Sequence, residues 1–300
     1  VNPKESLFLG ARRVSNGRHN ATITATPYIK QMVERYINGD DSKFPAQWSY
    51  TPASEDLVDA FKSAVATKKP ANAELMRKYG ELYGSLLHVT KYRPEVAMPL
   101  GLCATCLTFP TDQLYNCMVR ILVYLSRTRN MGTVFNGMAP ESKKIKAYAD
   151  ANWDVTRSVS GFIIMLACGT IIHCSKRQHC ISMSSCESEL IALADCAIEM
   201  LYVLNLLKFL GFEQDGPVEV CTDNKAAYDL CHRFASAQHT RHIDRKLFKM
   251  RELRGAGIVS VKLIPTETNP ADLFTKVLSR QLFARHRAPT LNLAGASGNG

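Results

Sequence analysis

The chain has 300 residues, which is enough for one or two domains with a buried core. Hydrophobic residues make up 46% and charged residues 21% of it, the balance of an ordinary soluble protein, and no apolar run approaches the roughly 20 residues that a membrane span needs. The net charge of +10 favours a polyanionic partner, with nucleic acid ahead of a membrane surface.

The first part of the chain is expected to be mostly helical. It opens with VNPKESLF, without an initiator Met or a signal peptide, as a piece of a longer protein would. Residues 1–70 mix short apolar runs with loop signals, and three later segments space apolar residues three and four apart. These predicted helices are 74–89, 93–107 and 111–128, the last capped by Thr111 or Asp112.

The second part alternates strands with helices. The segment GMAPESKK at 137–144 is polar and contains Pro and Gly, so we place a domain boundary there. Segments separated by turn residues predict strands at 145–151, 160–167, 169–176, 217–223 and 259–265. Helical spacing predicts helices at 184–211, 223–234, 242–257 and 269–280. This order predicts a mixed α/β layer fold, followed from residue 286 by a disordered tail.

Ten cysteines raise the question of disulfides or zinc. Most of them stand singly in apolar segments, and the C-x-x-C pair Cys103–Cys106 has no second pair and no suitably spaced histidines downstream. We interpret them as core thiols in a reducing compartment rather than as a metal or redox site.

The stretch SMSSCESELIALAD contains two glutamates, Glu187 and Glu189, which point about 200° apart on a helix. Ser184 and Glu187 match the capping box S-x-x-E, which gives Glu187 a structural role. Glu189 lies beside the apolar face, where a carboxylate is costly unless a cation binds it. We expect Asp195 and Glu199 to point away from that face to solvent.

Further carboxylates stand where a shared site could form. Asp150 and Asp223 close predicted strands, and ligands bind in the crevice beyond strand ends in α/β sheets. Asp272 lies in the first turn of the last predicted helix, where capping by Asn269 and the helix dipole explain it equally well. Carboxylates crowded with Glu189 into one site raise one another's pKa values unless divalent metal neutralises them. Oxygen ligands select Mg²⁺ or Mn²⁺, and two ions about 4 Å apart suit in-line attack on a phosphodiester.

Several motifs in chain order resemble one family. YADANW, RSVSGFII, SSCESELIALA, CTDNKAA, HTRHID and NPADLFTK resemble the ribonuclease H domain of Ty1/copia-type retrotransposon Pol polyproteins. Upstream, LFLGARR, YGELYGSLLHVTKYRPEVAMPL and MVRILVYLSRTRNMGTVF resemble the polymerase thumb and connection. The resemblance covers nearly all of residues 6–285. It implies a reverse transcriptase part at 1–136, a linker at 137–144 and, at 145–285, a ribonuclease H-like α/β domain with a five-stranded mixed sheet.

The resemblance also implies an activity. Asp150, Glu189, Asp223 and Asp272 take the four metal-binding positions of a two-metal ribonuclease H, with Mg²⁺ as cofactor or Mn²⁺ in its place. Asp150 would bridge both ions, Glu189 and Asp223 would hold one, and Asp272 would hold the other. The implied reaction cleaves RNA in RNA–DNA hybrids during reverse transcription. The implied partners are the hybrid and an upstream reverse transcriptase palm, and the implied location is a cytoplasmic virus-like particle or the nucleus.

Two departures from the family limit what is expected. The chain lacks the Tyr-x-Asp-Asp of a polymerase centre, and Asp40-Asp41 follow Asn-Gly in a polar loop that we interpret as a turn. Polymerase activity is therefore not expected. The loop before the last acid, 265–270, lacks the family's histidine, so His239 or His242 substitutes or that step is slower. Neither histidine has the partners that zinc requires, and packing or a phosphate contact suits His242 better.

Basic side chains are the candidate contacts to a nucleic acid backbone, with a merely solvated face as the alternative. They are Lys176 and Arg177 at a strand end and, in the basic helix, Arg241, His242, Arg245, Lys246, Lys249, Arg251 and Arg254. Small polar residues near the acids could recognise RNA 2′-hydroxyls. They are Asn152, Ser185 and Asn224.

Two other functions stay open. A degenerate or repurposed copy would bind nucleic acid without cutting it. A DDE transposase would need its glutamate last among the acids in chain order, whereas Glu189 comes second here.

Overall fold

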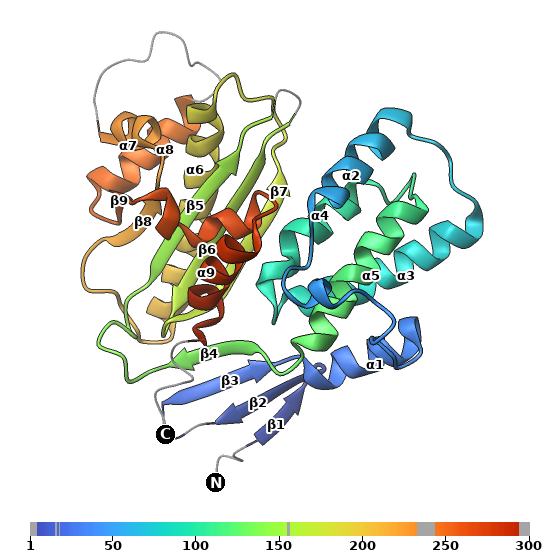
Figure 1. The fold of residues 1–300 in the computed structure, drawn as a ribbon. Coiled ribbons are helices and arrows are strands. Elements are labelled where there is room, and N and C mark those ends of the chain that lie inside the picture. Colours follow the sequence, from blue (N-terminus) through green and yellow to red (C-terminus); the bar gives the residue numbers. More distant parts are fainter. Residues whose placement is uncertain (1–4, 16, 18, 155–156, 233–243, 294–300) are drawn as a thin grey trace. The chain divides into compact units, whose positions relative to one another are not determined.

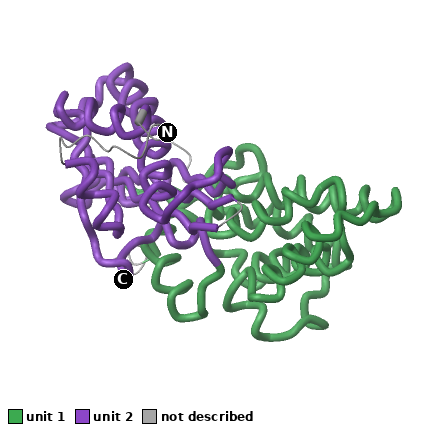
Figure 2. Tube along the Cα trace, turned by 90° about the horizontal axis from the view of Figure 1, so that it is seen from above, with its two compact units in different colours: residues 1–135, 277–300 green, residues 136–276 purple. Residues whose placement is uncertain are grey.

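Two separate stretches of chain build the first of two structural units. The computed structural model describes residues 5–15, 17, 19–154, 157–232 and 244–293 (Figure 1). Unit 1 comprises residues 1–135 and 277–300, and unit 2 comprises residues 136–276 (Figure 2). Unit 2 is therefore inserted, along the sequence, between two segments of unit 1.

Unit 1 is mostly helical, as the apolar spacing predicts. The predicted helices correspond to α3 (Ala73–Thr90), α4 (Ala97–Thr105) and α5 (Asp112–Arg127). Thr111 caps α5, because its hydroxyl accepts a hydrogen bond from the backbone N–H of Leu114 at 3.2 Å. The remaining helical elements of this part are α1 (Thr26–Ile37), η1 (Ala46–Ser49), α2 (Glu55–Thr67) and η2 (Pro94–Val96).

A four-stranded sheet in unit 1 was not predicted from the sequence. Its order is β1-β2-β3-β4. The strands are β1 (Glu5–Phe8), β2 (Ala11–Ser15), β3 (Asn20–Thr24) and β4 (Gly132–Asn136). Gly132 permits the close approach of β4 to β3, since a side chain there would collide with the backbone carbonyl of Ile23. β1 and β2 are mostly exposed, and their sequences ESLF and ARRVS do not alternate regularly between apolar and polar residues.

The C-terminal segment is helical where the structure describes it. α9 (Arg280–Leu291) buries Phe283 and Leu291 within unit 1, and the ring of Phe283 meets that of Tyr124 edge to face at 5.8 Å. Arg287 donates a hydrogen bond to the Tyr124 hydroxyl at 3.1 Å. The predicted disordered tail is therefore wrong for residues 286–293, because a polar segment with few apolar residues still docks on a core.

The segment 137–144, predicted to be a linker, belongs to unit 2. The Ser142 hydroxyl donates to the carbonyl of Gly137 at 2.9 Å, and the backbone N–H of Ala167 donates to the carbonyl of Ser142 at 2.9 Å. These bonds fold the segment onto the neighbouring strands, although its composition is typical of a connection. Unit 2 ends at Lys276 rather than near residue 285.

The predicted five-stranded mixed sheet is confirmed in unit 2. Its order is β7-β6-β5-β8-β9, with antiparallel pairing among β5, β6 and β7 and parallel pairing of β8 with β5 and β9. Parallel strands bring their carboxyl ends to one edge, so the ends of β5 and β8 are neighbours. The strands are β5 (Lys146–Asn152), β6 (Val159–Leu166), β7 (Gly169–Arg177), β8 (Val218–Thr222) and β9 (Val259–Leu263).

The long helix α6 (Ser185–Phe209) covers one face of this sheet and contributes Leu193 and Met200 to its core (Figure 1). It is long and apolar enough, by length and composition, to cross a membrane, contrary to the expectation from the sequence. Half of its most apolar window is buried within the protein, as in a core helix. Unit 2 also contains the helices α7 (Lys225–His232) and α8 (Asp244–Gly255).

The predicted helix at 269–280 is instead interrupted. A 3₁₀ helix, η4 (Pro270–Phe274), follows the short η3 (Thr266–Thr268). Ser279 then caps α9, accepting from the backbone N–H of Leu282 at 3.5 Å. The break separates Asp272 from α9 and leaves it on the sheet.

Candidate metal centre

Three of the predicted acidic residues meet at the carboxyl edge of the sheet in unit 2. Asp150 lies in β5, Glu189 in the second turn of α6, and Asp223 directly after β8. One carboxylate oxygen from each lies within 4.8 Å of one from each of the others. Asp150 is 2% and Glu189 6% exposed. The structure thus gathers side chains from distant parts of the sequence into an acidic cluster in which Asp150 and Glu189 are buried and Asp223 is half-buried.

The environment of Glu189 fits a cation. Burial, together with the charges of Asp150 and Asp223, raises its pKa to about 9, although the backbone N–H of Ala151 favours the charged form. Its Oε2 atom is buried and has no hydrogen-bond partner within the part of the chain that the structure describes. A buried acceptor among anionic neighbours is costly, and an oxygen-ligated divalent ion would satisfy it.

Asp272 lies in η4 and joins the cluster through a lysine. Its Oδ1 is 3.1 Å from the ammonium of Lys276, which is also 3.6 Å from Oδ2 of Asp150. Burial and the charge of Asp150 raise the pKa of Asp272 to about 7, although Lys276 opposes this shift. Sequence reasoning overlooked Lys276, for which the signal was its position four residues after Asp272 in NPADLFTK.

Asn269 connects three parts of this site. Its side-chain amide donates to Oδ1 of Asp223 at 3.2 Å and to the carbonyl of Ala149 at 3.1 Å. Its side-chain oxygen accepts from the backbone N–H of Ala271 at 3.1 Å, which confirms that Asn269 caps the turn bearing Asp272. A fully buried amide therefore ties η4 to the ends of β5 and β8.

A glycine lets η4 lie against the sheet beside Asp150. Gly161 pairs with Asp150 across β6 and β5. A Cβ atom at Gly161 would lie 2.6 Å from Cγ2 of Thr275 and 2.8 Å from Cβ of Phe274. The hydroxyl of Thr275 donates to Oδ2 of Asp150. The absence of a side chain at Gly161 thus permits the contact between Thr275 and Asp150.

The division of roles between Glu187 and Glu189 agrees with the helical geometry. The Ser184 hydroxyl accepts from the backbone N–H of Glu187 at 3.2 Å, so Ser184 is the cap of α6. The carboxylate of Glu187 accepts from the backbone N–H of Met183 at 2.6 Å, one residue earlier than the expected partner. Glu187 stabilises the start of α6, whereas Glu189 faces Asp150 and Asp223.

The sequence of the chain is similar to those of transposon Pol polyproteins. The chain is 30% identical over 266 residues to the retrovirus-related Pol polyprotein from transposon TNT 1-94 of Nicotiana tabacum, covering 87% of this chain and 19% of that protein. It is 29% identical over 282 residues to the Pol polyprotein from transposon RE1 of Arabidopsis thaliana, covering 92% and 18%. The chain is a homologue of transposon Pol polyproteins. The predicted resemblance is confirmed, and the chain spans about a fifth of the length of these relatives.

Solved structures similar to this Pol homologue include ribonucleases H. LC11-RNase H1 isolated from compost has a TM-score of 0.34 and 19% identity, covering 44% of this chain and 93% of that one. LC11-RNase H1 in complex with an RNA/DNA hybrid has a TM-score of 0.33 and 17% identity, covering 50% and 99%. No protein-family model matches the chain.

The side chain of Asp195 in this chain does not point to solvent, contrary to the prediction. Its side chain is 16% exposed and pairs with Lys246 at 2.6 Å and Lys176 at 3.1 Å. Asp195 therefore joins α6 to α8 and β7. The prediction was wrong because a helical wheel places Asp195 on the polar side of α6 but does not show that α8 and β7 border that side. Glu199 is exposed, as predicted.

Other residues of the basic helix also bind within the protein. Arg251 donates to the carbonyl of Leu230 at 3.0 Å, and Arg254 donates to the carbonyl of Cys231. Both carbonyls lie in the last turn of α7, where cations are favourable. Lys249 pairs with Glu252 at 3.1 Å. Arg245 is exposed. Arg241, His242 and His239 lie outside the described residues.

The three small polar residues considered as contacts to RNA 2′-hydroxyls differ in their surroundings. Asn152 and Ser185 are exposed. Asn152 lies two residues after Asp150, and Ser185 directly follows Ser184, the cap of α6. The side-chain oxygen of Asn224 instead accepts from the backbone N–H of Ala227 at 2.9 Å, so Asn224 caps α7. Its amide oxygen is therefore used within the protein.

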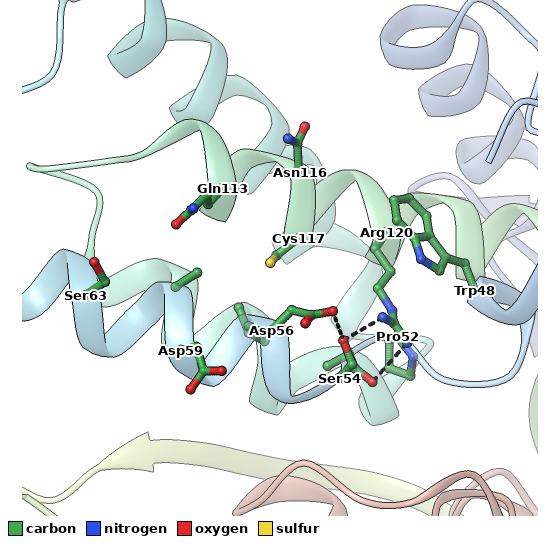
Figure 3. Close-up of a pocket in the computed structure, with 13 residues that line it drawn as sticks. Trp48, Pro52, Ser54, Asp56, Asp59, Ser63, Gln113, Asn116, Cys117 and Arg120 are labelled. Carbon is green, nitrogen blue, oxygen red and sulfur yellow. Dashed lines mark hydrogen bonds between the residues drawn. The ribbon is translucent and has the colours of Figure 1, made fainter. Parts of the chain in front are cut away.

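A cavity of about 550 Å³ lies in unit 1, between α2 and α5 (Figure 3). Arg120 lines it, but its guanidinium donates to the hydroxyls of Ser54 at 2.6 Å and Thr51 at 3.0 Å. The carboxylate of Asp56 accepts from the Ser54 hydroxyl at 2.8 Å. The charged groups of Arg120 and Asp56 are thus bound to other residues of the protein. The acidic cluster of unit 2 is therefore the stronger candidate site for chemistry.

Asp40 and Asp41 lie in a turn of unit 1, as predicted. Asp40 accepts from the backbone N–H of Ser42 at 2.9 Å. Asp41 accepts from the Ser126 hydroxyl at 2.5 Å and lies 3.7 Å from Arg127. Both carboxylates have a local structural role.

Proposed function

We propose that the chain is the ribonuclease H-bearing part of a retrotransposon Pol protein, a divalent-metal-dependent endonuclease that cleaves the RNA strand of RNA–DNA hybrids. The observation that carries this proposal is the convergence of the carboxylates of Asp150, Glu189 and Asp223. One of their oxygens, Oε2 of Glu189, is buried and has no hydrogen-bond partner in the described ranges. Such clusters suit hard cations such as Mg²⁺ or Mn²⁺. The Pol relatives and the net charge of +10 support a nucleic acid substrate.

The protein groups divide the work by position. Bound divalent ions would supply a Lewis acid for the phosphodiester and would acidify water. Glu189 and Asp223 would hold one ion together with Asp150, and Asp272 would hold the other with the same Asp150. Asn269 would keep Asp223 oriented, since its amide already binds an oxygen of that carboxylate.

Substrate contacts are proposed for exposed groups near the cluster. Asn152 and Ser185 would donate to RNA 2′-hydroxyls, because both are exposed and close in sequence to the site. Arg245, exposed on α8, would contact a phosphate. Lys176 is half-exposed but is paired with Asp195, so its contribution would require that pair to open.

The test is cleavage of a labelled RNA–DNA hybrid by the purified chain in Mg²⁺. We expect Asp223→Asn to lower the rate at least about 10²-fold, a barrier increase of about 2.7 kcal/mol or more. Asp229→Asn is the matched control, because it makes the same change at a residue paired with Lys225 on α7. Its rate should equal that of the parent.

The outcomes separate the possible functions. Cleavage that needs Mg²⁺ and Asp223 supports the proposal. Retention of the hybrid on a filter without cleavage, by parent and variant alike, indicates a copy that binds nucleic acid without cutting it. Equal cleavage by the parent and Asp223→Asn removes Asp223 from the site.

A further inference from the structure

The two sides of the acidic cluster differ in their countercharge. On one side, the ammonium of Lys276 lies 3.1 Å from Asp272 and 3.6 Å from Asp150. The Thr275 hydroxyl donates to the same oxygen of Asp150 that faces Lys276. The side chains of Asp272 and Asp150 are only 6% and 3% exposed, whereas that of Lys276 is 35% exposed. A protein cation therefore already offsets one of the two negative charges of the pair Asp150–Asp272.

Among the described residues, the other side has no such cation. Glu189 and Asp223 form no ion pair within 4 Å in the described ranges, and Oε2 of Glu189 has no hydrogen-bond partner there. An ion that binds between Glu189, Asp223 and Asp150 meets no ammonium at Glu189 or Asp223 within the described residues, and Lys276 lies 3.6 Å from only one of its three ligands, Asp150. An ion that binds between Asp150 and Asp272 must displace Lys276.

We propose that Lys276 is a built-in counter-ion that competes with one of the two divalent ions, so that the two ions bind with unequal affinity. The first ion binds tightly at Asp150, Glu189 and Asp223. The second ion binds weakly at Asp150 and Asp272 until the ammonium moves to solvent. This inference rests on the proposed metal-dependent function and assigns to Lys276 the difference between the two sites.

The competition has a simple physical basis. A charge-assisted contact to two buried carboxylates is strong, so its loss opposes binding of the incoming ion. The four-carbon stem of lysine is flexible, and a third of the Lys276 side chain is exposed, so the ammonium can leave without disturbing η4. A change of this kind next to metal ligands alters metal affinity by about 10- to 100-fold.

The test is a titration of the full chain with Mn²⁺ in the absence of nucleic acid. Binding is measured by calorimetry and by the electron spin resonance signal of free Mn²⁺. The parent should bind one ion tightly and a second at least about 10-fold more weakly. Lys276→Met should tighten the second ion about 10-fold or more and leave the first within about threefold. Lys276→Arg, which keeps the charge, should retain the unequal pair.

The matched control is Lys262→Met, which removes a lysine paired at 3.3 Å with the half-buried Glu219 and changes the net charge equally. Its titration should match that of the parent. Identical titrations of the parent and Lys276→Met overturn the competition. Absence of any Mn²⁺ binding by the parent instead overturns the metal centre on which the proposed function depends.

A second measurement uses the parent alone and is independent of variant folding. Reductive methylation with mass spectrometry reports how accessible each lysine is. Methylation of Lys276 should increase on saturation with Mg²⁺, whereas that of Lys262 should not change. Equal methylation of Lys276 with and without Mg²⁺, in a chain that binds two ions, contradicts displacement.

Discussion

The side-chain nitrogen of Asn269 lies 3.2 Å from a carboxylate oxygen of Asp223 and donates a hydrogen bond to it. The same nitrogen is 3.1 Å from the carbonyl of Ala149, one residue before Asp150. Asn269 is fully buried, so one amide group links the ends of the paired strands β5 and β8 away from solvent.

Asn269→Asp should impair the site without changing side-chain size. It replaces the amide donor by an oxygen that repels Asp223, and loss of a buried donor costs about 1–3 kcal/mol. We expect the free energy of unfolding to fall by about 2 kcal/mol and hybrid cleavage to fall about 10- to 100-fold. Denaturant unfolding and initial rates measure these effects. Asn116→Asp, an exposed position in α5, should change neither.

Glu187→Ala and Glu189→Ala should separate scaffold from chemistry. Glu187 accepts from the backbone N–H of Met183, so its loss should reduce the free energy of unfolding by about 1 kcal/mol while cleavage persists. Glu189→Ala should abolish cleavage and weaken Mn²⁺ binding. The reverse pattern of activities would show that the assignment of the two helix faces is wrong.

The metal-free protein should lose stability as pH rises. The pKa of Glu189 is raised from 4.5 to about 9 by burial and neighbouring charge, so the unfolded state releases this proton first. The stabilising contribution is complete below about pH 4.5 and is lost as pH rises towards 9. The pKa of Asp272, raised to about 7, acts in the same direction.

Thermal unfolding in EDTA between pH 5 and 9 measures this dependence. Glu189→Gln should flatten it and raise the stability of the metal-free protein at pH 8 by about 1 kcal/mol, as relief of active-site strain commonly does. Saturating Mg²⁺ should stabilise the parent but not this variant. A parent whose stability rises with pH over this range would contradict the raised pKa of Glu189.

Gly161→Ala should disturb the packing of η4 on β6. The new methyl group would lie 2.6 Å from Thr275 and 2.8 Å from Phe274, and overpacking of this kind costs about 1–3 kcal/mol. Cleavage should fall because Thr275 binds Asp150. Gly84→Ala is a control in α3 with nothing within 4 Å of the added atom, and it should stabilise the protein by up to about 1 kcal/mol.

The sequence predicted the sheet of unit 2 because its strands are apolar or alternating runs separated by turn residues. The positions of Asp150 and Asp223 followed from those strands, and the position of Glu189 followed from the angular spacing of one helix. Lys276 was overlooked because NPADLFTK was interpreted as a continuous helix, on which a lysine after an aspartate is an ordinary surface pair.

Other features depend on contacts that no local pattern contains. The sheet of unit 1 pairs residues from opposite ends of its first segment, and α9 is stable because Phe283 reaches Tyr124. The two lysines on Asp195 come from β7 and α8, which are distant in sequence from α6. Tertiary packing determines each of these.

The return of α9 to unit 1 couples the thermodynamics of the two units. The side-chain amide of Asn292 donates to the carbonyl of Val134 at 2.9 Å. This hydrogen bond connects the segment that precedes unit 2 to the segment that follows it. If unit 2 unfolded alone, its 141 residues (276 − 136 + 1) would form a closed loop, with an entropic penalty on the order of 4 kcal/mol. A proteolytic cut within the insertion would relieve that constraint, so nicked protein should melt in two separate transitions.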